Sequence, residues 1–189
     1  MNLHALVAAL AAAIVIPAAA QETYVFDPVH SQPIFEAPHL GFSTQRGSFG
    51  KVTGKVTLNR AAKTGTVDVT IDTTSIRTFD ARLDTAAKGD KFFNVEKYPT
   101  MTFKSTNVIF DGDRVVGVNG DLTMLAVTKS VNLKVDNFKC GENPFNKKAM
   151  CGAEAWATIK RSEWGMTANL PFAPGDDIKI TLPIEAYLE

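Results

Sequence analysis

Two histidines, His30 and His39, lie nine positions apart in the stretch HSQPIFEAPH near the start of the chain. Histidines at such a spacing suggest two kinds of chemistry, metal binding and acid–base catalysis. A metal site would need further ligands, and the neighbouring Glu36 completes no recognisable set. A catalytic base would need a nucleophile, but Ser31 and Ser43 lie in no G-x-S-x-G motif. The sequence therefore predicts neither a metal site nor catalytic residues, and it leaves open whether the histidines are structural or contact a bound molecule.

Arg161, which is followed by Ser162, is a second candidate for chemistry. A guanidinium group can bind an anionic group such as a phosphate, or it can pair with a carboxylate such as that of Asp121 and so fix the fold. Of these two alternatives, we expect the ion pair.

The composition excludes several classes of protein. The chain has 189 residues, enough for one domain with a sizeable core. Its 20 Lys and Arg residues balance 20 Asp and Glu residues, and a nucleic-acid-binding protein would carry a basic excess. Because 45% of the residues are hydrophobic, a folded protein is expected rather than a disordered one, and we expect no nucleic-acid partner.

Residues 1–20 have the pattern of a cleavable signal peptide. They contain no Asp, Glu, Lys or Arg, they are apolar from Leu6 to Ile16, and they end in three alanines. An apolar segment followed by an A-x-A site predicts cleavage between Ala20 and Gln21. The segment is short for a membrane span, which needs about 20 apolar residues, although a retained anchor is the alternative. The mature domain is then expected to comprise residues 21–189.

Cys140 and Cys151 enclose a short loop that contains Gly, Asn and Pro. Two cysteines in an exported protein suggest a disulfide bond, whereas their spacing fits neither a usual zinc site nor a C-x-x-C redox pair. We expect a structural disulfide that stabilises the fold by about 2–3 kcal/mol.

Apolar and polar residues alternate along most of the mature chain. The segment IKITLPIEAYL, for example, places Ile178, Ile180 and Leu182 on one face and Lys179 and Thr181 on the other. This alternation predicts seven to nine antiparallel strands, each with one apolar face.

One segment, residues 79–93, departs from this pattern and predicts a short helix, with Asp80 as its N-cap and Gly89 at its end. About eight strands can hide their apolar face in a sandwich or in a closed barrel, and the helix could plug one end. Small residues on the apolar face, such as Gly54, Ala155 and Ala157, could leave an internal space, or bulky neighbours such as Phe103 could fill it.

Four blocks of the sequence resemble the YceI-like family of exported lipid-binding proteins. They are DPVHSQPIFEAPHLGFSTQRGSF, KFFNVEKYPTMTFKST, GDLTMLAVTKSVNL and IKRSEWGM, in the family's order from Asp27 onward. The resemblance implies an all-β fold, an extended lipocalin-like antiparallel β-barrel around an apolar tunnel. It also implies a bound isoprenoid lipid, either a polyprenyl chain or an isoprenoid quinone.

With this resemblance, the predicted ligand is a hydrophobic small molecule, and no further cofactor is expected. The residues predicted to line the tunnel or its mouth are His30, Phe35, His39, Phe49, Val52, Gly54, Val56, Val69, Phe103, Val131, Leu133, Ala155, Ala157, Ile180 and Leu182. We expect a soluble periplasmic binding or carrier protein that is not an enzyme, with transient membrane contact and a homodimer as further expectations. The alternatives are an exported structural or interaction module with a filled core, and an enzyme acting on an isoprenoid lipid.

Overall fold

The computed structural model describes residues 21–189. The predicted signal peptide, residues 1–20, and with it the predicted cleavage after Ala20, lies outside the described residues.

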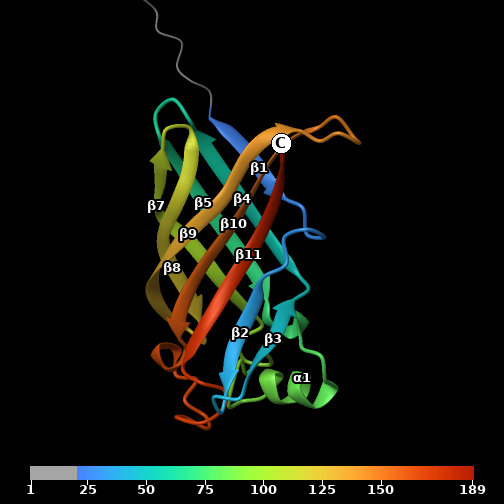
Figure 1. Cartoon of the computed structure of the whole chain (residues 1–189), viewed down its shortest axis with the longest axis vertical. Helices are drawn as coiled ribbons and strands as arrows, with labels where there is room; N and C mark the ends of the chain where they lie inside the picture. The colour runs from blue at the N-terminus through green and yellow to red at the C-terminus, as the bar shows by residue number, and fades with distance from the viewer. Residues whose placement is uncertain (1–20) are drawn as a thin grey trace, which may run out of the picture.

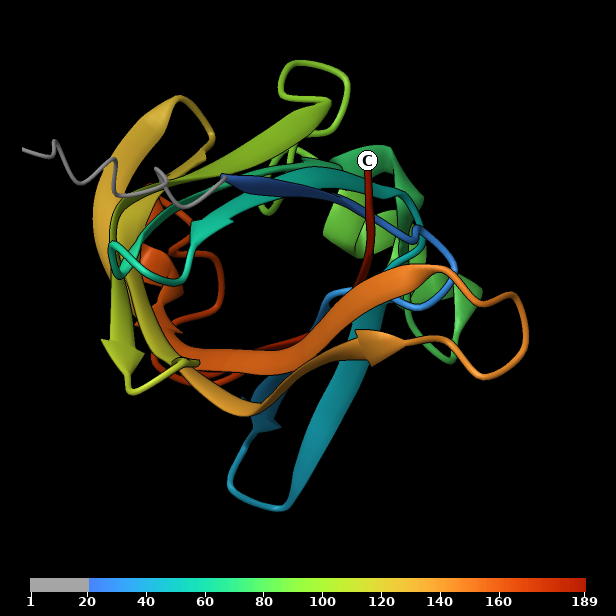
Figure 2. The same ribbon diagram turned by 90° about the horizontal axis from the view of Figure 1, so that it is seen from above.

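Eight antiparallel strands close into a barrel (Figures 1 and 2). The order around the barrel is β1-β4-β5-β7-β8-β9-β10-β11, and β11 pairs again with β1. These strands are β1 (Glu22–Phe26), β4 (Val52–Asn59), β5 (Thr64–Asp72), β7 (Thr100–Asp111), β8 (Arg114–Met124), β9 (Val127–Glu142), β10 (Ala149–Lys160) and β11 (Asp177–Leu188). The prediction of an all-β antiparallel barrel of about eight strands is confirmed.

Alternation sets the face that each strand presents to the interior. On β9, Val131, Leu133 and Val135 are buried while Asn132 and Lys134 between them are exposed. Because side chains of a strand alternate between the two faces of a sheet, the apolar half of every strand points inward.

Three further strands widen the barrel at one end. They are β2 (Ile34–His39), β3 (Ser43–Phe49) and the short β6 (Ile76–Arg77). Strand β11 pairs with β1 near its C-terminal end and with β2 near its start, where Ile180 lies opposite Phe35. Strands β3 and β6 continue the sheet from β2. In Figure 2, the β2–β3 hairpin projects outward from the barrel.

The helix α1 (Ala81–Lys88) lies at the same end, next to β6 (Figure 1). The Asp80 side chain caps it by accepting a hydrogen bond from the backbone N–H of Arg82, and Gly89 follows its last residue. Both predicted helix boundaries are therefore confirmed. Two 3-10 turns, η1 (Thr73–Ser75) and η2 (Arg161–Trp164), follow β5 and β10.

The opposite half of the barrel, which carries the β4–β5 and β7–β8 hairpins, contains a core of buried apolar side chains. Its core residues include Tyr24, Phe26, Leu58, Val67, Val115, Val118, Val135 and Ala186, all less than 10% exposed. Cys140 and Cys151 lie opposite each other on β9 and β10 and form the predicted disulfide. Among the described residues, neither the length nor the hydropathy of any helix suffices for a membrane span.

Candidate ligand cavity

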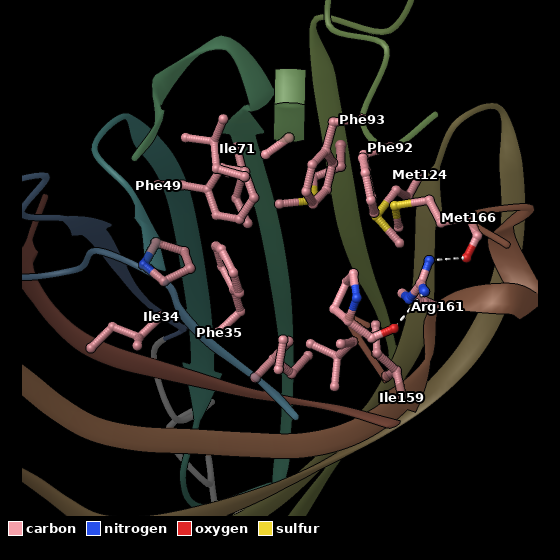
Figure 3. A pocket seen from close by; sticks show the side chains of 18 of the residues that line it. Ile34, Phe35, Phe49, Ile71, Phe92, Phe93, Met124, Ile159, Arg161 and Met166 are labelled. Atoms are coloured by element: carbon pink, nitrogen blue, oxygen red, sulfur yellow. Dashed lines mark hydrogen bonds between the residues drawn. The ribbon is translucent and has the colours of Figure 1, made fainter. Parts of the chain in front are cut away.

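A cavity of about 380 Å³ occupies the end of the barrel that holds β2, β3 and α1 (Figure 3). Its wall contains residues of the barrel strands, of α1, and of the connection between β10 and β11. The volume is within the range of about 300–1,000 Å³ that is typical of ligand pockets.

The cavity wall is almost entirely apolar. The polar side chains that line it are those of His39, Gln45, Thr78, Arg161 and Asn169. An apolar wall with a few polar groups is suited to a hydrophobic ligand that has at most a small polar part.

Aromatic rings form one side of this wall. The ring centroids of Phe35 and Phe49 are 6.0 Å apart, and those of Phe49 and Phe93 are 5.3 Å apart with nearly perpendicular planes. These rings come from β2, β3 and the segment after α1, and Figure 3 shows them facing the cavity opposite Met124 and Met166. Rings and thioethers offer broad, polarizable contact to an apolar chain.

The exposed lining residues show where the cavity opens. Ile34 on β2 is 40% exposed and Leu83 on α1 is 46% exposed, although both line the cavity. His39, Gln45 and Asn169 are also exposed lining residues. The mouth therefore lies among β2, β3, α1 and the β10–β11 connection.

Arg161 is buried, and its guanidinium group binds backbone carbonyls rather than a carboxylate. Its Nε donates to the carbonyl of Gly175, its Nη1 to Met166, and its Nη2 to Ala168 and Pro174, at 2.6–3.0 Å. The expected ion pair with Asp121 is wrong, since that carboxylate accepts a hydrogen bond from Ser130 on the neighbouring strand β9. Arg161 instead fixes the shape of the β10–β11 connection, which forms part of the cavity wall and of its mouth.

The charge of Asp176 acts on Arg161, although Asp176 makes its hydrogen bonds to Ser162 rather than to the guanidinium group. Asp176 accepts hydrogen bonds from the backbone N–H and the hydroxyl of Ser162, and the first of these holds the pKa of Asp176 below its ordinary value. Burial lowers the pKa of Arg161, and the charge of Asp176 opposes this shift. The Arg161 guanidinium also lies over the ring of Phe92, 5.7 Å from its centroid.

His30 does not line the cavity and is exposed on the outside of the barrel. Its Nδ1 lies 2.7 Å from an oxygen of Asp27 and 3.9 Å from one of Glu185. The hydrogen bond to Asp27 raises the pKa of His30 and lowers that of Asp27. Sequence reasoning found no acidic partner for His30, whereas the structure brings together one imidazole and two carboxylates within 4.8 Å.

Ser31 fixes this region to the barrel. It is 2% exposed, its hydroxyl donates to the carbonyl of Glu185, and it accepts a hydrogen bond from the N–H of the same residue. Ser31 is therefore a structural link between the segment after β1 and strand β11.

Nine of the fifteen residues predicted to line the tunnel or its mouth lie in the wall of the cavity. They are Phe35, His39, Phe49, Val69, Phe103, Val131, Leu133, Ile180 and Leu182.

The other six do not line it: His30 is exposed on the exterior, and the remaining five are on strands of the barrel, namely Val52, Gly54, Val56, Ala155 and Ala157. Ala155 and Ala157 are buried and pair with Leu182 and Ile180, whose longer side chains reach the cavity.

Sequence reasoning also missed part of the wall. Phe92 and Phe93 follow the helix, while Met166 and Pro174 belong to the irregular β10–β11 connection. Alternation cannot detect lining residues that lie outside strands. The two adjacent phenylalanines of KFFNV, in the segment that leads from the helix to the next strand, could have indicated that this segment packs against the interior.

Comparison with known proteins agrees with this architecture. Protein YceI of Escherichia coli O157:H7 is 36% identical over 142 residues, which is 75% of this chain and 73% of that protein. The crystal structure of the Campylobacter jejuni YCEI protein matches with a TM-score of 0.72 and 26% identity, over 80% of this chain and 89% of the other. A structure described as a polyisoprenoid binding domain from Saccharophagus degradans has the same fold, with a TM-score of 0.65 and 14% identity over 88% of this chain and 98% of that one.

The family model of the YceI-like domain matches residues 24–186, from the first strand of the barrel to the last. The chain belongs to the YceI-like family.

Proposed function

We propose that this protein is an exported binding or carrier protein for an isoprenoid lipid, held by its apolar tail in the cavity. The observation that carries the proposal is the cavity itself: about 380 Å³, open at one end, with an almost entirely apolar wall. The name of the Saccharophagus degradans structure supports the choice of an isoprenoid. The disulfide supports export to an oxidising compartment, for which we propose the periplasm.

Apolar burial is sufficient to bind such a ligand. Each methylene that leaves water contributes about 0.8 kcal/mol before the costs of association and ordering are subtracted. The polar groups at the mouth, His39, Gln45 and Asn169, are placed to contact a quinone ring or another small head group. Because Arg161 is occupied by backbone carbonyls, we do not assign it to an anionic head group.

The decisive experiment is organic extraction of the protein purified from the periplasmic fraction, followed by mass spectrometry. We expect a polyprenyl lipid or an isoprenoid quinone in near-stoichiometric amount, and N-terminal sequencing should find Gln21 first. In parallel, stripped protein should bind ubiquinone added from detergent micelles.

Two outcomes would contradict the proposal. Protein that carries no lipid and binds no added ubiquinone would favour a structural or interaction module. Conversion of the added ubiquinone to another compound by the protein alone would favour an enzyme.

A further inference from the structure

Three phenylalanine side chains at the cavity end of the barrel are almost fully exposed. Phe42 is 91% exposed, Phe79 is 92% exposed and Phe172 is 70% exposed. Isolated apolar residues on a surface are ordinary, but several large ones around a binding site indicate an interaction surface.

Each of these phenylalanines is close in sequence to residues that line the cavity. Phe42 lies at the tip of the β2–β3 hairpin between His39 and Gln45, Phe79 follows Thr78, and Phe172 precedes Ala173. The three therefore extend from three separate segments, each of which contributes to the cavity wall.

These segments lie at the same end of the barrel, although Figure 2 shows the β2–β3 hairpin and helix α1 on different sides of it. In Figure 1 the β2–β3 hairpin, helix α1 and the β10–β11 connection are all at the lower end of the molecule, opposite the β4–β5 and β7–β8 hairpins. Two lining residues of the cavity at this end, Ile34 and Leu83, are themselves partly exposed.

The charges near the phenylalanines do not make a strongly basic surface. Arg46 near Phe42 is paired with Glu36 at 2.6 Å, and Arg82 near Phe79 is paired with Asp80 at 2.8 Å. Attraction to anionic head groups would therefore contribute little to the free energy of membrane binding here, and burial of the rings in the membrane interface would contribute more.

We propose that Phe42, Phe79 and Phe172 dock this end of the barrel onto a lipid bilayer. This inference rests on the proposed function, because the partner follows from the ligand. An isoprenoid dissolved in a bilayer would have to expose its tail to water to reach a free protein, whereas docking of the mouth on the bilayer reduces that exposure. Exposed aromatic rings suit the interface, where an apolar body enters the acyl boundary.

The test is flotation of the protein with phosphatidylcholine vesicles. The variant carries Phe42→Ser, Phe79→Ser and Phe172→Ser together. The matched control is Phe145→Ser, since Phe145 is 94% exposed in the disulfide loop between β9 and β10, at the other end of the barrel. We expect the triple variant to lose at least about tenfold in vesicle binding and the control to bind like wild type.

Three results would overturn the inference. The first is vesicle binding by the triple variant equal to that of wild type. The second is binding of wild type only to vesicles that contain phosphatidylglycerol. The third is absence of vesicle binding together with a dimer of the chain that depends on the three phenylalanines. Loading with ubiquinone from detergent micelles separates this inference from the proposed function. If wild type loads ubiquinone but does not bind vesicles, only the docking inference fails, whereas absence of loading contradicts the function itself.

Discussion

The ring of Phe26 lies directly against Gly54: a Cβ atom on Gly54 would be 2.9 Å from both Cδ2 and Cε2 of Phe26 and 3.1 Å from the carbonyl oxygen of Asp68. The absence of a side chain at Gly54 therefore accommodates an aromatic ring and not a ligand. The ring of Phe26 therefore occupies the space beside Gly54 inside the barrel.

Gly54→Ala should consequently destabilise the protein without affecting the ligand. Overpacking of a filled core costs about 1–3 kcal/mol, and here one of the crowded atoms is a backbone oxygen that cannot move away freely. Urea unfolding should show the loss, while ubiquinone binding to the folded protein should be unchanged. Unaltered stability would mean that the ring of Phe26 has room to move.

Val131→Phe should block the cavity, and Val118→Phe is its matched control. Both valines are buried, 6% and 5% exposed, on the neighbouring strands β9 and β8, but only Val131 lines the cavity. We expect Val131→Phe to fold with little loss of stability and to bind ubiquinone at least about tenfold more weakly, because the new ring enters empty space. Val118→Phe should lose about 1–3 kcal/mol of stability and keep its affinity. If Val118→Phe weakened ubiquinone binding and Val131→Phe did not, the ligand would lie in the other half of the barrel.

Local physics was sufficient to predict the strands, the helix and the disulfide, whereas closure into a barrel was implied by the resemblance to the YceI-like family, since alternation alone allowed a sandwich as well. Alternation assigned Val131 and Leu133 to the interior face, and Asp80 and Gly89 marked the helix by their capping chemistry. The pairing of Cys140 with Cys151 followed from there being no other cysteine.

Which of the inward residues line the cavity could not be predicted in the same way. Period two separates inside from outside, but it is identical for the buried Ala155 and for Leu182, its partner on β11, of which only Leu182 lines the cavity. Arg161 was misassigned for a related reason: its partners are carbonyls of an irregular segment, and backbone acceptors leave no trace in residue types.

Removal of the disulfide should lower stability and leave binding intact. The bond closes a short loop at the end of the barrel away from the mouth, so its contribution comes mainly from restricting the unfolded chain. We expect Cys140→Ser with Cys151→Ser to lower the free energy of unfolding by about 2–3 kcal/mol, with unchanged affinity for ubiquinone. Native, unreduced protein should show no thiol that reacts with a labelling reagent, and labelling of both cysteines would contradict the pairing.

Arg161→Met should disrupt the β10–β11 connection at the mouth of the cavity, although the substituted side chain is of similar length. It leaves buried carbonyls of the β10–β11 connection without donors, at about 1–3 kcal/mol for each one that water does not reach. We expect a loss of stability of more than about 3 kcal/mol and faster proteolysis within residues 166–175, measured by urea unfolding and limited digestion. A stable variant with selective loss of anionic ligands would instead indicate that Arg161 serves a head group.

The pair of His30 and Asp27 should make stability, and not ligand binding, depend on pH. The hydrogen bond between them raises the pKa of His30 above 6.5 and lowers that of Asp27 below 3.8. A raised histidine pKa contributes stability that is complete below about pH 6.5 and disappears as the pH rises through the pKa of the folded state. A lowered aspartate pKa contributes stability above about pH 4 that disappears as the pH falls through its own folded value.

The difference in melting temperature between wild type and His30→Gln should therefore be largest between about pH 4 and 6.5 and should shrink at higher pH. His39→Gln is the control, since no carboxylate pairs with His39 among residues 21–189. Affinity for ubiquinone should change little between about pH 5.5 and 8 in wild type and both variants, because burial of the uncharged tail supplies most of the binding free energy. If His30→Gln abolished ubiquinone binding while circular dichroism showed an intact fold, His30 would belong to the ligand site, and its exposed place on the outer surface would need another explanation.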